Sequence, residues 1–205
     1  NLRFFPAHGA GSLCGANLSD EPVSTIGAQK RENPYLQFKD RHSYVTAVIS
    51  GLPGAPPYFS HNAGMNHDGP AKIDWEALPP ELLPADVKAR SDAGAWLLDI
   101  RDAAEFAAGH PAGALNIGIR GRFETWTGIM VPWGAPFILV GSSAEVKEAV
   151  FRLHRIGYDA PAGSLKGGVA AWKQAGLPMG TVKLVGPADL HAQMRAGTAP
   201  ILVDV

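Results

Sequence analysis

The sequence contains a single cysteine, Cys14, among its 205 residues. One cysteine cannot close an intramolecular disulfide, so a fold that depends on disulfides is excluded and a reducing compartment is favoured. We interpret Cys14 as a small buried apolar residue and not as a reactive thiol. We therefore expect a cytoplasmic protein.

The chain also lacks an excess of charge and a long apolar run. Its 18 basic and 19 acidic residues give a formal net charge of −1, without a basic cluster. Nucleic acid and membrane surfaces are therefore not expected as partners, and no stretch is long enough to span a bilayer. The 46% of hydrophobic and 18% of charged residues are typical of a globular protein with one or two cores.

Two segments carry a recognisable pattern of strand, turn and helix. The first is WLLDIRDAAEFAAGHPAGALNI at residues 96–117, and the second is LKGGVAAWKQAGLP at residues 165–178. Both resemble the opening and closing motifs of rhodanese-like sulfurtransferases. The resemblance implies an α/β domain over residues 84–182, with a short parallel sheet covered by helices on both faces. The unbroken apolar runs WLLDI and FILVG fit strands that are buried on both faces.

The cysteine that carries sulfur in that family is missing. In rhodanese-like enzymes it lies between a buried strand and the next helix, and this junction reads FILVGSSAEVKEAV at residues 137–150. Counting back from Gly157 places the nucleophile at Val140 or Gly141. Sulfur transfer needs a thiolate that becomes a persulfide, which neither residue provides. We therefore expect no catalytic residue in this domain.

The serines that follow are explained better as helix caps than as nucleophiles. Ser142 and Glu145 have the spacing of a capping box, and apolar residues then recur with helical period until Gly157 ends the helix. A serine hydroxyl has no comparable persulfide chemistry. Glu145 also brings negative charge to a helix N-terminus, where a working rhodanese binds an anion.

Several polar residues of the opening motif resemble a catalytic set, but we interpret them as architectural. Asp99 ends a parallel strand, where its carboxylate can accept hydrogen bonds from the N–H groups of the following loop. Asp102 and Glu105 have the spacing of a second capping box, on a helix that Gly109 ends. The residues of the motif without an expected catalytic role are Asp99, Arg101, Glu105 and His110.

The sequence also repeats itself. LPADVKARSDAGAWLLDI at residues 83–100 is echoed by GPADLHAQMRAGTAPILVDV at residues 186–205. Pro84 matches Pro187 at a spacing of 103 residues, and Asp99 matches Asp204 at a spacing of 105. Each copy predicts a short helix, a glycine turn and a buried strand that ends in aspartate. We therefore expect residues 183–205 to be the start of a second rhodanese-like domain, truncated in this chain.

The first residues suggest a different fold. NLRFFPAHGAGSLCG at residues 1–15 resembles the last metal-site strand of metallo-β-lactamase-fold enzymes of the glyoxalase II and persulfide dioxygenase group. Residues 19–38 and 56–70 are similar to the sulfur dioxygenase branch of that group. The resemblance implies the C-terminal part of an αββα metallo-β-lactamase domain over residues 1–75, including a helix over residues 40–50, and then a linker over residues 76–83. The order of parts is that of bacterial fusions between a sulfur dioxygenase and tandem rhodanese-like domains.

His8 is the metal-site candidate that this resemblance implies. In the group, the Pro-x-His after the strand supplies the last histidine, which would bind the metal directly or orient a substrate or water beside it. The whole protein would hold iron, or alternatively zinc. The chain lacks the His-x-His-x-Asp-His cluster of the group, so we expect no metal bound to this chain alone.

Three basic residues lie in the segment that helps to bind glutathione in the glyoxalase II-like group. Solvent-exposed helix faces commonly carry basic residues in the same pattern without binding a ligand. These weak candidates for substrate binding are Lys30, Arg31 and Arg41.

Three functions remain open. The whole protein would oxidise a low-molecular-weight persulfide, such as glutathione persulfide, to sulfite and thiol at a non-haem iron site. Alternatively, it would be a zinc-dependent hydrolase of glutathione thioesters, or the cysteine-free rhodanese-like domain would act as a docking module. The expected partners are the missing N-terminal metal-site half and the C-terminal rhodanese of the same protein, and a homo-oligomer is compatible with the sequence. We expect this chain alone to be inactive.

Overall fold

The computed structural model describes residues 2–8, 20–50, 54–69, 72–158 and 161–203. The chain forms two compact units, residues 1–54 and residues 55–205. Cys14, Gly51, Pro53 and Asp204 lie outside the described residues.

The first unit consists of short elements. Strands β1 (Arg3–Phe4) and β2 (Ser24–Thr25) pair in antiparallel fashion. Helix α1 (Ile26–Glu32) begins where the Thr25 hydroxyl accepts a hydrogen bond from the Ala28 N–H at 3.1 Å, and a 3₁₀ turn (Pro34–Leu36) follows it. Helix α2 (Arg41–Ile49) confirms the helix expected over residues 40–50. None of the described residues of α1 and α2 is buried.

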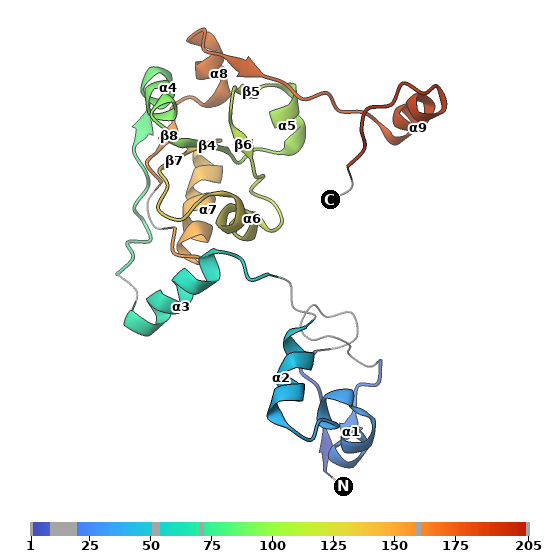
Figure 1. The fold of residues 1–205 in the computed structure, drawn as a ribbon. Coiled ribbons are helices and arrows are strands. Elements are labelled where there is room, and N and C mark those ends of the chain that lie inside the picture. Colours follow the sequence, from blue (N-terminus) through green and yellow to red (C-terminus); the bar gives the residue numbers. More distant parts are fainter. Residues whose placement is uncertain (1, 9–19, 51–53, 70–71, 159–160, 204–205) are drawn as a thin grey trace. The chain divides into compact units, whose positions relative to one another are not determined.

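The second unit is built on a parallel sheet (Figure 1). Five strands lie in the spatial order β3 (Glu81–Leu82), β8 (Gly163–Leu165), β7 (Phe137–Val140), β4 (Trp96–Asp99) and β6 (Leu115–Asn116). Each neighbouring pair is parallel, which confirms the α/β fold class. Strands β4 and β7 pair along their whole length and form the centre of the sheet.

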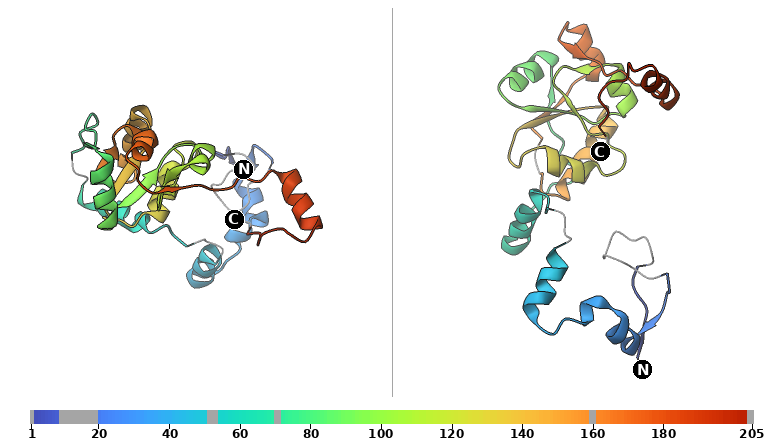
Figure 2. Two further views of the ribbon diagram at one scale, coloured as in Figure 1. Left: turned by 90° about the horizontal axis from the view of Figure 1, so that it is seen from above. Right: turned by 45° about the vertical axis from the view of Figure 1, so that its right-hand side comes forward.

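Helices cover both faces of this sheet (Figure 1; Figure 2, right). One face carries α4 (Pro84–Asp92) and α8 (Gly168–Gln174), and the other carries α6 (Phe123–Met130) and α7 (Ser143–His154). Helix α5 (Ala103–Ala108) follows β4, and the short strands β5 (His110–Pro111) and β9 (Met179–Gly180) pair in antiparallel fashion. The remaining helices of the described residues are α3 (Tyr58–Asp68) and α9 (Pro187–Arg195).

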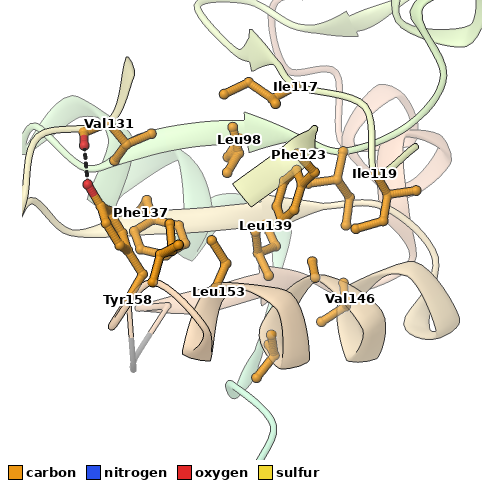
Figure 3. Packing of buried hydrophobic residues seen from close by; sticks show 14 of the residues in the cluster. Leu98, Ile117, Ile119, Phe123, Val131, Phe137, Leu139, Val146, Leu153 and Tyr158 are labelled. Carbon is orange, nitrogen blue, oxygen red and sulfur yellow. Dashed lines mark hydrogen bonds between the residues drawn. The ribbon is translucent and has the colours of Figure 1, made fainter. Parts of the chain in front are cut away.

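The apolar runs of the central strands feed two cores, because successive side chains point to opposite faces of a sheet. Phe137 and Leu139 pack under α6 and α7 together with Val146 and Leu153 (Figure 3). Ile138 and Val140 pack on the other face with residues of α4 and α8, among them Trp172. The absence of alternation in FILVG is therefore the result of burial on both faces.

Helix α3 packs against the first of these cores. Tyr58 is buried in the cluster under α6 and α7, and a Cβ added to Gly128 would collide with Cδ1 of its ring and lie 2.8 Å from Cε1. His61 stacks on Trp133, with ring centroids 3.3 Å apart. The second compact unit begins at Ala55, so α3 belongs to it although the resemblance to the metallo-β-lactamase group covers residues 1–75. The order of motifs along the chain does not predict that the Tyr58 side chain packs into this core.

The two copies of the sequence repeat have the same helix ends. Helices α4 and α9 both begin with proline, and both end in a Schellman motif with a glycine in the left-handed region. In each copy, two backbone N–H groups after the helix donate hydrogen bonds to carbonyls of its last turn. These bonds are Ala95 to Arg90 at 2.9 Å, Gly94 to Ser91 at 3.0 Å, Thr198 to Gln193 at 3.0 Å and Gly197 to Met194 at 3.2 Å.

The strand predicted for the second copy is not formed by the described residues 199–203. These residues have no regular structure, and Ile201 is 93% exposed. The expectation of a buried strand is wrong for this part of the chain, because no described strand pairs with it and a strand needs a neighbour for its backbone hydrogen bonds.

Candidate functional site

A cavity of about 1060 Å³ lies at the carboxyl ends of the parallel strands. This edge is where open α/β sheets commonly place their ligands, because the loops after the strands converge there. Residues from the loops after β4, β7 and β8 line the cavity together with the end of β8 and the start of α7. Among them are Arg101, Gly141, Ser142, Glu145, Ser164 and Gly167.

The N-terminus of α7 is capped by two side chains of the same segment. Glu145 Oε2 accepts hydrogen bonds from the backbone N–H of Ser142 at 2.8 Å and from its hydroxyl at 2.7 Å, and the Glu145 N–H donates to Ser142 Oγ at 3.3 Å. The predicted capping box is therefore confirmed. A carboxylate from the chain itself occupies the helix N-terminus, which is the position that attracts anions.

The two positions where the sequence comparison places a nucleophile offer no side chain to the cavity. Val140 is fully buried at the end of β7, in the core on the α4 and α8 face. A Cβ added to Gly141 would lie 2.7 Å from Cγ1 of Ile100 and 3.3 Å from Oε2 of Glu145. A larger residue at Gly141 would therefore have to displace the Ile100 side chain.

Asp99 and Arg101 tie the end of β4 to its loop. The buried carboxylate of Asp99 accepts from the Arg101 N–H at 3.1 Å, from its Nε at 2.9 Å and from its Nη2 at 2.6 Å. Nη2 also donates to the Gly109 carbonyl at 2.9 Å. Burial alone lowers the pKa of Arg101, but the hydrogen bond and charge of Asp99, with smaller effects from Glu105 and Glu145, raise it above its ordinary value. The expected contact between Asp99 and loop N–H groups is confirmed.

The second predicted capping box, on α5, is wrong. Asp102 precedes the helix but makes no side-chain hydrogen bond to its N-terminus. Its carboxylate lies 3.7 Å from Arg120 instead, in a largely exposed ion pair. Gly109 does end α5, with an extended backbone at φ 168°. His110 is buried, with Nδ1 2.8 Å from the Phe106 carbonyl and its ring stacked on Phe106. This packing supports its architectural interpretation.

The candidate site residues of the expected metallo-β-lactamase part lie in the first compact unit. His8 is exposed after β1, and no group of three or more His, Cys, Asp or Glu residues that could hold a metal occurs within the described ranges. Lys30 and Arg31 lie on α1 and Arg41 opens α2, and all three are exposed. Roles for these four residues in metal or substrate binding remain predictions.

Two features of the rhodanese-like part were not foreseen from the sequence. Arg152 on α7 forms an ion pair with Glu124 on α6, and its guanidinium donates to the carbonyls of Ile119 and Gly121. Ser164 on β8 lines the cavity although it is almost completely buried. Neither feature belongs to a local motif. The partners of Arg152 are distant from it in the sequence, and the position of Ser164 depends on the pairing of β8 with β3.

Comparison with known proteins assigns the second unit. The family described as "Rhodanese-like domain" matches residues 83–175. A search of curated proteins found no match. None of the helices in the described residues combines the length and apolar character that crossing a membrane requires.

Solved structures extend the likeness beyond the rhodanese-like part. A metallo-β-lactamase from Staphylococcus aureus has a TM-score of 0.56 and 25% identity over 80% of this chain, and this chain covers 45% of its length. A protein from Anabaena, Alr3790, has 23% identity over 57% of this chain and 99% of its own, at a TM-score of 0.46. A rhodanese-related protein from Thermoplasma volcanium has 22% identity over 49% of this chain and 97% of its own, at a TM-score of 0.42. Residues 83–175 are a rhodanese-like domain, and the chain matches a metallo-β-lactamase fold joined to such a domain.

Proposed function

We propose that the chain is part of a sulfur-metabolism enzyme that, as a whole protein, oxidises a low-molecular-weight persulfide such as glutathione persulfide to sulfite and thiol. The rhodanese-like domain and the metallo-β-lactamase among the similar structures support this reaction class. The described residues do not fit a metal site, because no group of three suitable ligands occurs among them. The expected iron would therefore need ligands from other residues of the whole protein, with His8 as the candidate that this chain contributes.

Within that enzyme, residues 83–175 act as a binding module and not as a sulfurtransferase. The observation that supports this role is the Glu145 carboxylate, which is hydrogen-bonded to Ser142 at the helix N-terminus. A persulfide anion in the same position would lose those hydrogen bonds to the carboxylate and would be repelled by its charge. No thiol is available there to carry sulfur, because Val140 and Gly141 stand at the nucleophile position.

Two assays test the two parts of this proposal, the first on the full-length protein and the second on this chain alone. The first measures O₂ consumption with glutathione persulfide, in the wild type and in the His8→Ala variant. We expect turnover by the wild type and a decrease of about 10- to 100-fold in the variant, the range typical when a residue that supports a metal site is removed. Hydrolysis of a glutathione thioester faster than persulfide oxidation would replace the proposal by the zinc hydrolase alternative.

The second assay measures thiocyanate formation from thiosulfate and cyanide by the 205-residue chain. We expect no formation above a heat-denatured control. Thiocyanate formation that disappears in Ser142→Ala or Ser143→Ala would show that residues 83–175 are catalytic and would overturn the binding-module role.

A further inference from the structure

We propose that the cavity at the carboxyl ends of β4, β7 and β8 binds an alkylammonium group, as carried by a lysine side chain or a small diamine. This proposal rests on the role of residues 83–175 as a binding module, and it names the chemical class of the ligand. Three properties of the cavity support it: its charge, a hydroxyl group in its lining and its apolar wall.

The charge of the cavity is negative. Glu81, Glu105 and Glu145 are among the described residues that line it, and Arg101 is the basic residue among them. The positive charge of Arg101 is balanced by the buried Asp99, to which it is joined by two side-chain hydrogen bonds. Arg101 also interacts electrostatically with Glu105 and Glu145, but one cation faces three glutamates in the lining, so the lining keeps a net negative charge. Such a field disfavours anions and attracts a cation.

Ser164 presents a hydroxyl group to the same space. The residue is only 7% exposed and lines the cavity, yet its hydroxyl makes no hydrogen bond to any residue of the described ranges. Ser164 pairs with Glu81 across the parallel strands, so both side chains leave the same face of the sheet. The hydroxyl oxygen faces the cavity, where an N–H of a bound ammonium would donate to it while a glutamate balances the charge.

The rest of the wall suits a hydrocarbon stem. Leu78, Pro79, Val146, Leu165 and Val169 supply apolar surface around the polar groups. An ammonium on a short methylene chain matches this division, because its stem packs on apolar side chains while its head stays with the charged ones. The volume of about 1060 Å³ is at the upper end of the range of ligand pockets, and it leaves room for a stem and for the group that carries it.

The test is an NMR titration of the 205-residue chain with n-butylammonium, and with n-butanol as the neutral probe of similar shape. We expect saturable shifts of the Ser142 and Ser164 amide signals with n-butylammonium, and weaker, non-saturating changes with n-butanol. Higher ionic strength should weaken the binding, since the attraction is between charges near the surface.

Two variants assign the binding to the glutamates. Glu145→Gln removes the charge and keeps an acceptor for the capping box, and Glu105→Gln alters a residue without a capping role. Each should weaken n-butylammonium binding about five-fold, as expected for one partly exposed ion pair. The control is Glu148→Gln, on α7 but outside the lining and close to Arg152, and it should bind like the wild type.

Equal binding of n-butanol, or unchanged binding in both cavity variants, would overturn the proposal. Because thiocyanate formation is measured separately, a chain without sulfurtransferase activity that also ignores n-butylammonium would overturn this inference alone. Two further probes separate the sources of the ligand. Tighter binding of Nα-acetyl-lysine methylamide than of 1,5-diaminopentane would identify a lysine side chain of a polypeptide, and the opposite order would identify a free diamine.

Discussion

The Glu145 carboxylate lies 3.3 Å from the position that a Cβ on Gly141 would take, and Cγ1 of Ile100 lies 2.7 Å from the same position. The bend between β7 and α7 is therefore constrained by a charge and by the core together. This pair of constraints determines how the rhodanese-like domain responds to substitution at the nucleophile position.

Gly141→Cys should not create sulfurtransferase activity. The new side chain would collide with Ile100, and Glu145 would oppose the thiolate and its persulfide. Overpacking should also lower the free energy of unfolding by about 1–3 kcal/mol. Thiocyanate formation and urea unfolding measure the two effects. The double variant Gly141→Cys, Glu145→Gln separates them, because only the steric conflict remains in it. Thiocyanate production by the single variant would contradict our account of the site.

Ser142→Ala should lower the free energy of unfolding by about 1 kcal/mol, because it removes the hydroxyl that accepts from the Glu145 N–H. Ser143→Ala is the matched control. Its side chain is exposed at the first position of α7 and makes no hydrogen bond within the described ranges, so a change within about 0.5 kcal/mol is expected. Thermal or urea unfolding measures both variants. An equal decrease in the free energy of unfolding in the two variants would show that the capping box does not stabilise the domain.

Glu124→Gln should weaken the domain in a way that depends on pH. Burial tends to raise the pKa of Glu124, but hydrogen bonds to its own backbone and to Arg152, with the charges of Arg152 and Arg155, lower it below its ordinary value of 4.5. A carboxyl with a lowered pKa in the folded state contributes stability above its unfolded pKa, and this contribution is lost as the pH falls through the folded pKa.

The wild type should therefore exceed Glu124→Gln in stability at pH 6, and the difference should shrink as the pH falls below about 4.5. Urea unfolding at a series of pH values measures it. Glu148→Gln, which removes a more exposed partner of the same Arg152, is the control and should show a small effect. A difference that stays constant down to acid pH would exclude the ion pair as its cause.

Gly128→Ala should loosen the packing of α3 on the rhodanese-like core. The glycine lies in α6 against the ring of Tyr58, which a methyl group would displace. Gly64→Ala in α3 is the control, because nothing lies within 4 Å of the added methyl group. Alanine is the better helix former by about 1 kcal/mol, so the control should gain stability while Gly128→Ala loses it.

Urea unfolding measures the stability of both variants, and limited proteolysis reports whether residues 55–69 become accessible. Gains of equal size at the two positions would show that Tyr58 does not hold α3 to the core.

The sequence predicts what depends on neighbouring residues. The cap of α7 needs only Ser142 and Glu145, so their spacing in the sequence is enough to predict it. The unbroken apolar run FILVG likewise predicts a strand buried on both faces, and its residues are buried. The same spacing fails at Asp102, because its carboxylate has a competing partner in Arg120, which lies 18 residues further along the chain. Local spacing cannot reveal such a competitor.

The cavity was less predictable than the fold. Its position follows from the parallel sheet, which the rhodanese-like motifs imply. The exposure of Ser164 to the cavity, however, depends on the pairing of β8 with β3, and the anchoring by Arg152 depends on α6. Both are contacts between segments far apart in the sequence, so no periodicity or motif predicts them.

The ends of α4 and α9 differ in their surroundings but not in their hydrogen bonds. Val87 of α4 is fully buried in a core, whereas α9 has no buried residue, yet both helices close through the same Schellman motif. The closure therefore does not require a surrounding core. Each glycine stop behaves as a locally encoded terminator, able to form before tertiary contacts exist, and it fixes where the chain leaves the helix while the rest of the molecule is still folding.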